Sequence, residues 1–180
     1  VDESGQPKIL DFGVARATDS DRQATMQTDV GQIVGTLPYM SPEQVKADPS
    51  ELDTRSDVYT LGVILYELLT GRLPYEVQRR TLSESLRTIC EEAPASLRAI
   101  DRAFRGDVET IVSKALAKER ERRYDSAAGL AADIRRYLTD EPIIARPPSA
   151  GYQLGKFARR NKALVGGVVA VFVVLVGGVL

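Results

Sequence analysis

The most regular hydrophobic pattern along the chain runs over residues 54–70 and predicts an α-helix. Thr54 is expected to cap its first turn, with Asp57 three residues later completing a capping box, and Gly71 is expected to end it. Because apolar residues cover a broad face, we expect this helix to be buried on most sides. The residues on this face are Val58, Leu61, Ile64, Leu65, Leu68 and Leu69, and Val63 and Tyr66 widen it.

The other patterns predict a mainly α protein that opens with a short β-hairpin. Turn residues and a short apolar strand predict the hairpin, and periodic apolar residues predict further helices. The last of these helices carries Ala127, Leu130, Ala131, Ile134 and Leu138 on one face. In chain order the expected segments are a hairpin over 1–14, a long loop over 15–36, a short helix over 42–47, helices over about 82–91, 107–118 and 126–138, and a Pro-rich connector over 139–151.

The end of the chain has a different pattern, because residues 163–180 include no charged or polar side chain. Eighteen residues of helix span about 27 Å, close to the roughly 30 Å hydrocarbon core of a bilayer. The segment therefore predicts a transmembrane helix whose span continues past Leu180, with a buried helix of a soluble protein as the alternative. The basic cluster before it predicts that the preceding residues face the cytosol and attract anionic lipids. This cluster consists of Lys156, Arg159, Arg160 and Lys162.

Composition excludes several classes of function. A formal net charge of -1 argues against a nucleic-acid partner bound through bulk charge, and the absence of histidine excludes His-based acid–base catalysis and most zinc sites. Cys90 is the single cysteine, so the chain cannot form an intramolecular disulfide and suits a reducing cytosol, where this side chain is expected to be buried. The chain opens at Val1 without a methionine or a signal-like segment, and we expect it to be an internal piece of a longer protein.

Four short motifs occur in a distinctive order. They are Asp11-Phe12-Gly13, the stretch Gly35-Thr36-Leu37-Pro38-Tyr39-Met40-Ser41-Pro42-Glu43 that begins 22 residues later, Ser56-Asp57-Val58-Tyr59-Thr60-Leu61-Gly62, and Arg122-Arg123-Tyr124. Together they resemble the C-terminal lobe of eukaryotic-type (Hanks-type) Ser/Thr protein kinases, and the resemblance covers about residues 1–140. With the basic cluster and the apolar run at the end of the chain, the arrangement resembles the membrane-anchored, receptor-like Ser/Thr kinases of bacteria.

By resemblance, the first motif belongs to the nucleotide site. Asp11 would bind the Mg²⁺ that neutralises charge on the phosphates of ATP, the expected phosphoryl donor. Phe12 would pack differently in active and inactive states, and Gly13 would let the backbone turn sharply. The implied cofactors are therefore ATP and Mg²⁺.

The resemblance also assigns roles in the later motifs. Glu43 would form a buried ion pair with Arg123, with Arg122 as the competing partner. Thr36 would hydrogen-bond the catalytic loop. Asp57 would brace the backbone of that loop, a role that is compatible with the capping box because one carboxylate has several lone pairs.

The loop over 14–34 resembles a kinase activation loop, which phosphorylation orders through contacts with arginines. Thr25 and Thr28 are the candidate phosphorylation sites because they lie near its Gly35 end. The alternative is that they are unmodified polar loop residues.

The predicted organisation is a partial kinase C-lobe over 1–140, a Pro-rich and basic juxtamembrane linker over 141–162, and the transmembrane helix over 163–180. The 180 residues include no Gly-rich nucleotide loop, no strand lysine paired with a helix glutamate and no His-Arg-Asp catalytic loop. We therefore expect the chain alone to be inactive, and the longer protein to phosphorylate protein serines and threonines.

Two rival interpretations remain open: a pseudokinase or membrane-anchored signalling scaffold, and a free-standing helical membrane anchor. The expected partners are protein substrates and the lipid bilayer but no nucleic acid, and a homodimer is left open. The expected location is a single-pass membrane protein with the kinase lobe in the cytosol.

Overall fold

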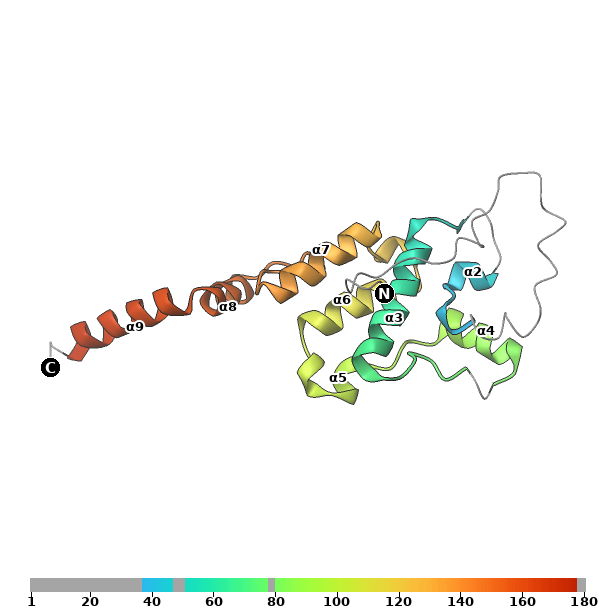
Figure 1. Ribbon diagram of the computed structural model, residues 1–180, viewed down its shortest axis with the longest axis horizontal. Coiled ribbons are helices and arrows are strands. Elements are labelled where there is room, and N and C mark those ends of the chain that lie inside the picture. The colour runs from blue at the N-terminus through green and yellow to red at the C-terminus, as the bar shows by residue number, and fades with distance from the viewer. Residues whose placement is uncertain (1–36, 47–50, 78–79, 178–180) are drawn as a thin grey trace, which may run out of the picture. The chain divides into compact units, whose positions relative to one another are not determined.

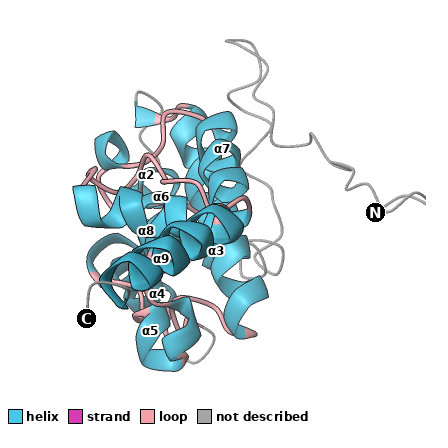
Figure 2. Cartoon of the chain, turned by 90° about the vertical axis from the view of Figure 1, so that its left-hand side faces the viewer, coloured by secondary structure: helices cyan, strands magenta, loops and turns pink. Residues whose placement is uncertain are grey.

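The computed structural model describes residues 37–46, 51–77 and 80–177, and all of its regular elements within these ranges are helices (Figures 1 and 2). The predicted hairpin over 1–14 and loop over 15–36 lie outside the described residues. The mainly α prediction is confirmed for the rest. The α-helices are α2 (Pro42–Lys46), α3 (Thr54–Thr70), α4 (Leu82–Glu91), α5 (Leu97–Ile100), α6 (Asp107–Ala115), α7 (Ala127–Leu138), α8 (Ala150–Arg160) and α9 (Lys162–Gly177), and short 3₁₀ helices lie at Leu37–Tyr39, Arg102–Phe104 and Arg120–Arg122.

Helix α3 has the predicted bounds, but its N-cap differs from the prediction. Asp53 is the N-cap, and its side chain accepts a hydrogen bond from the Arg55 N–H at 2.8 Å. The predicted capping box is therefore wrong, because an aspartate with extended backbone lies one residue earlier and Thr54 instead donates to the Asp125 carbonyl. At the other end Gly71 adopts the left-handed conformation (φ 69°) and donates to Glu67 O at 2.7 Å, as the C-cap prediction requires.

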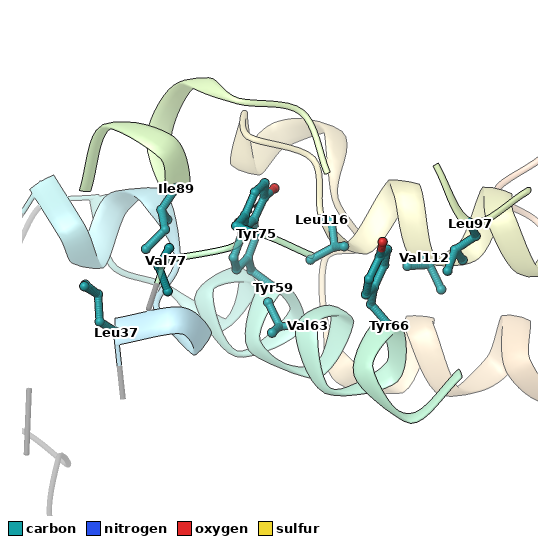
Figure 3. Packing of buried hydrophobic residues seen from close by; sticks show 10 residues of the cluster. All are labelled: Leu37, Tyr59, Val63, Tyr66, Tyr75, Val77, Ile89, Leu97, Val112 and Leu116. Atoms are coloured by element: carbon teal, nitrogen blue, oxygen red, sulfur yellow. Dashed lines mark hydrogen bonds between the residues drawn. The ribbon is translucent and has the colours of Figure 1, made fainter. Parts of the chain in front are cut away.

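Helix α3 packs against α6 and α7 and supplies much of the core (Figures 1 and 3). Its side chains Tyr59, Val63 and Tyr66 are almost fully buried and contact residues from the other elements. Burial of large apolar and aromatic side chains supplies the main stabilisation of such a lobe. The ten buried residues of this cluster are Leu37, Tyr59, Val63, Tyr66, Tyr75, Val77, Ile89, Leu97, Val112 and Leu116.

The opposite face of α3 is exposed, contrary to the expectation that most of the helix would be buried. Leu61 and Ile64 are 39% and 38% exposed, and Leu68 is 78% exposed. The physical reason is that the described helices cover only the side that carries Val58, Tyr59 and the other buried residues. Periodicity shows that a face is apolar but not what covers it.

The helix predicted over 107–118 ends earlier, at Ala115, and the one predicted over 126–138 begins at Ala127 after an N-cap at Ser126. On this last helix Leu130 is buried as expected, whereas Leu138 is 73% exposed. A charged residue, Asp133, takes the innermost position because it accepts several hydrogen bonds there.

Close contact between α3 and α6 depends on Gly62. A Cβ atom at this position would lie 2.9 Å from Ala115 Cβ and 3.2 Å from Leu116 Cδ2. Gly62→Ala is therefore expected to lower the free energy of unfolding by roughly 1–3 kcal/mol through overpacking, as measured by urea denaturation. Gly155→Ala on α8 is the control, since a Cβ atom there would meet open space. This substitution is expected to be neutral or to stabilise the fold by up to about 1 kcal/mol. Equal losses at both positions would contradict this account of the α3–α6 contact.

Helix α9 occupies most of the apolar run at the end of the chain. It has 16 residues, and its exposed apolar side chains include Leu164, Val171 and Val174. Among the described residues no helix combines the length and the apolar character needed to cross a membrane. The predicted transmembrane helix over 163–180 is thus not found in the described part of the chain.

Candidate functional site

A buried ion pair joins Glu43 on α2 to Arg123, which lies just before α7. The Glu43 carboxylate accepts two hydrogen bonds from the guanidinium, at 2.6 Å from Nη1 and 2.8 Å from Nη2. It accepts a third from Ser56 Oγ at 2.7 Å. The side chains of Arg123 and Glu43 are 0% and 4% exposed, so this contact is fully shielded from water.

The remaining donors of Arg123 all bind backbone carbonyls. Nε donates to Ala117 O at 2.7 Å, Nη1 to Arg55 O at 3.1 Å and Nη2 to Lys118 O at 2.9 Å. With the two bonds to Glu43, the five N–H groups of the guanidinium are satisfied. The carbonyls of residues 117 and 118 are free for this role because α6 ends at Ala115. The ion pair therefore ties α2, the start of α3 and the α6–α7 connection together.

The hydrogen bonds keep Glu43 ionised despite its burial. Burial by itself would raise the pKa of this carboxyl, but the bonds from Arg123 and Ser56 outweigh it and lower the pKa to about 2. Arg122, the competing partner, has a side chain that is 74% exposed and lies 3.4 Å from Glu119. Of the two arginines, Arg123 is the one that contacts Glu43.

The residues before Glu43 are held against the same helix. Tyr39 donates from its hydroxyl to Glu67 Oε2 at 2.8 Å, and Thr60 Oγ1 donates to the Tyr39 carbonyl at 3.0 Å. The bond to Glu67 raises the pKa of the Tyr39 hydroxyl. Leu37 inserts into the core at the other end of the stretch (Figure 3). We call residues 37–46 the anchored segment, because core packing, hydrogen bonds and the ion pair all fix it to α3.

Comparison with known proteins agrees with this geometry. The protein kinase domain family matches residues 1–133. The chain belongs to the protein kinase family. Serine/threonine-protein kinase PknB of Mycobacterium tuberculosis is 39% identical over 135 residues, which cover 75% of this chain and 21% of that protein. A probable serine/threonine-protein kinase of Streptomyces coelicolor is 39% identical over 140 residues, 78% of this chain and 20% of the relative.

A probable serine/threonine-protein kinase PknB of Bifidobacterium longum is 36% identical over 165 residues, 91% of this chain and 23% of the relative. The kinase chain thus spans about a fifth of the length of the curated relatives it matches. The resemblance to bacterial Hanks-type kinases that the motifs indicated is confirmed.

All residues predicted for the nucleotide site, the activation loop and the substrate loop lie outside the described residues of the kinase: Asp11, Phe12, Gly13, Thr25, Thr28 and Thr36. Their roles stay predictions. Asp57 is described and lies exposed in the first turn of α3. Within the described ranges, no group of three or more His, Cys, Asp or Glu side chains could hold a metal ion.

A second polar cluster of the kinase, which is partly buried, was missed by the sequence analysis. Lys118 Nζ donates to Tyr75 OH at 2.7 Å, bonds the Ile89 carbonyl and lies 4.1 Å from the centroid of the Tyr75 ring. Burial lowers the pKa of Lys118 to about 8 and raises that of Tyr75 to about 12. No local pattern pointed to a contact between residues 43 positions apart. The cluster fixes the loop after α3 to the residues that follow α6, next to the carbonyls that bind Arg123.

The single cysteine is half-buried rather than buried, and its Sγ lies 3.8 Å from the Pro42 carbonyl. Burial raises the pKa of the Cys90 thiol, which disfavours the reactive thiolate. Cys90 therefore fits the structural role that the sequence analysis expected, as a side chain that packs α4 against α2.

Proposed function

We propose that this chain forms the C-terminal, substrate-side lobe of a bacterial Ser/Thr protein kinase. The kinase would transfer the γ-phosphoryl group of ATP to serine or threonine hydroxyls of other proteins. The observation that carries the proposal is the anchored segment, in which Glu43 forms a buried bidentate ion pair with Arg123 and accepts a further hydrogen bond from Ser56. The family match over residues 1–133 and the Ser/Thr-kinase relatives support it.

In the proposed reaction the substrate hydroxyl oxygen attacks the γ-phosphorus, the bond from that phosphorus to the β–γ bridging oxygen breaks, and ADP leaves. The hydroxyl proton would go to a catalytic aspartate that these 180 residues do not contain. Asp11 would hold Mg²⁺ through its hard carboxylate oxygens, and the ion would supply charge neutralisation at the phosphates. Phe12, Gly13 and Thr36 would shape the surroundings of that carboxylate and of the substrate.

The anchored segment would form the surface on which a protein substrate binds. Its tyrosine, Tyr39, is joined by hydrogen bonds to two residues of α3, and its glutamate is joined to the α6–α7 connection. A segment fixed at both ends has little freedom to lose when a substrate binds. The activation loop before it, with Thr25 and Thr28 as proposed phosphorylation sites, would then control access to this surface.

We also propose that the apolar run over 163–180 attaches the kinase to a lipid bilayer, with the lobe on the cytosolic side. Support comes from the uninterrupted apolar sequence, from the exposed apolar side chains of α9 and from the basic residues before it. Leu164 and Val174, for example, are 57% and 71% exposed. Transfer of these exposed apolar side chains from water into a bilayer is favourable.

The phosphoryl-transfer proposal is tested with radiolabelled ATP, Mg²⁺ and a generic protein substrate. We expect no transfer by the 180-residue chain and clear transfer by the longer protein that contains it, because the catalytic base and nucleotide loop are supplied only by the latter. Transfer by the chain alone above a no-enzyme control would contradict the expected role of the missing motifs. No transfer by the longer protein, with ATP binding also lost, would favour the pseudokinase or scaffold interpretation.

A further inference from the structure

Helix α8 packs on the kinase lobe with its polar face rather than its apolar face. Lys156 is 6% exposed, and its ammonium lies 2.8 Å from the carboxylate of Asp107, the first residue of α6. Tyr152, one turn earlier, donates from its hydroxyl to the same carboxylate at 3.1 Å. Arg146 also approaches Asp107, at 3.5 Å. The buried ion pair between Lys156 and Asp107 thus determines which side of α8 faces the lobe.

The connector before α8 fixes the helix further. Ile143 is buried in the cluster that contains Val58 and Tyr124. The buried carboxylate of Asp133 accepts hydrogen bonds from the backbone N–H groups of Ile144 and Ala145, at 2.7 and 2.8 Å. These contacts leave α8 little freedom to rotate about its axis. Its outward face is therefore set by the lobe.

That outward face is apolar. Ala150, Leu154 and Phe157 follow one another at spacings of four and three residues, so they share one side of the helix. Leu154 is 68% exposed and Phe157 is 42% exposed. Because Tyr152 and Lys156 face the lobe, the side chains of Leu154 and Phe157 are left facing outward, where contact with an apolar partner would be favourable.

The charge around this face is positive. Residues 142–180 include five basic side chains and no acidic one. Arg159, Arg160 and Lys162 at the end of α8 and the start of α9 are exposed. The nearest acidic residues precede the helix, and each lies close to a cation: Asp140 is 3.8 Å from Lys156 and Glu141 is 3.7 Å from Arg160.

We propose that α8 lies in the surface of an anionic bilayer, with Leu154 and Phe157 inserted among the lipids and the basic residues at the headgroups. The Lys156–Asp107 pair then holds the kinase lobe in one orientation to the membrane. This inference rests on the proposed attachment through α9, which follows α8 after the single residue Asn161. The positive charge and this continuity favour anionic lipid over a second copy of the chain, whose α8 would carry the same charges.

The chain has no tryptophan, so a single introduced tryptophan reports on one position. We would reconstitute Phe157→Trp into phosphatidylglycerol vesicles with brominated acyl chains and record its emission. The expected result is a blue shift and a loss of more than about half of the intensity, because the ring lies within reach of the bromines. Pure phosphatidylcholine vesicles with the same bromination should quench it clearly less.

Two further single-tryptophan variants separate this inference from the attachment itself. Leu164→Trp on α9 reports the attachment, and Leu82→Trp on α4, where the native side chain is 54% exposed, should stay unquenched. Quenching at 164 without quenching at 157 would overturn the surface position of α8 and leave the attachment standing. Absence of quenching at both would overturn the attachment, and the inference with it.

Three other outcomes decide the identity of the partner. Equal quenching at 157 in phosphatidylglycerol and phosphatidylcholine would overturn recognition of anionic lipid. A blue shift without vesicles, together with a dimer in analytical ultracentrifugation, would assign the face to a second copy instead. Changing Arg159 and Lys162 to glutamine in the Phe157→Trp protein should remove the preference for phosphatidylglycerol and so support the proposal.

Discussion

Glu43→Ala is expected to lower the free energy of unfolding of this chain by roughly 3–5 kcal/mol. The substitution leaves the guanidinium of Arg123, whose side chain is 0% exposed, in the interior without a counter-charge. It also removes the acceptor of the Ser56 hydroxyl. Urea denaturation followed by far-ultraviolet circular dichroism gives the free energy of unfolding for the wild type and the variant under the same conditions.

The matched controls are Arg123→Ala, the double variant and Arg122→Ala. Because Glu43 and Arg123 share two short hydrogen bonds, the double variant should cost less than the sum of the two single ones. Arg122 is on the surface, so its replacement should cost about 0–1 kcal/mol. Strictly additive losses for Glu43 and Arg123 would mean that the buried pair is not energetically coupled.

A pH titration of the same proteins checks the same contact. The pKa of Glu43 is about 2 in the folded chain and lies near 4.5 for an unpaired glutamate. Because the folded pKa is the lower one, the stabilisation is fully present above about pH 4.5 and is lost as the pH falls towards 2. Wild type should therefore lose stability over that range relative to Glu43→Gln, whose side chain does not titrate. Parallel curves for the two proteins would contradict the lowered pKa.

Asp11→Asn in the longer kinase is expected to reduce phosphoryl transfer below about a tenth of the wild-type rate. The substitution keeps the size of the side chain but removes the charge proposed to bind Mg²⁺. Thermal unfolding should change little, which separates this effect from that of Glu43→Ala. The measurements are the initial rate with labelled ATP and the melting temperature of both proteins.

A surface aspartate provides the control for Asp11. Asp125 is 87% exposed and contacts Arg55 at the start of α3, so Asp125→Asn should retain the wild-type rate. If Asp11→Asn keeps more than a tenth of the activity while Asp125→Asn keeps all of it, Asp11 is not the metal ligand. If both variants lose activity equally, the loss reflects removal of negative charge in general.

Helix α3 illustrates how much of a helix the local sequence predicts. A long periodic run and a following glycine are local signals, and they predicted both ends of the helix as the structure has them. Its N-cap was assigned one residue late, because Asp53 and Thr54 are both good capping residues and only the backbone conformation distinguishes them. The exposure of Leu68 could not be predicted either, since it depends on which helices pack nearby.

The partner of Glu43 shows the same limit in the candidate site. Resemblance to a family favoured Arg123 as the partner and left the adjacent Arg122 as the alternative, because their order in sequence does not show which side chain points inward. Arg123 donates to the carbonyls of Ala117 and Lys118, just after the end of α6, and to the Arg55 carbonyl. This arrangement exists only after the chain has folded. Lys118 and Tyr75 are a similar case, since their contact was not anticipated at all.

Sequence by itself determined the kinase family, the order of the motifs and the main helices, because these depend on neighbouring residues and on local spacing. Tertiary structure alone decided which charged residues besides Glu43 and Arg123 are buried. Asp107, Asp133 and Lys156 are ordinary charged residues in sequence, yet they are buried and fix the connector and α8 to the lobe. A buried charge is stable only when distant parts of the chain supply its partners, and no local pattern carries that information.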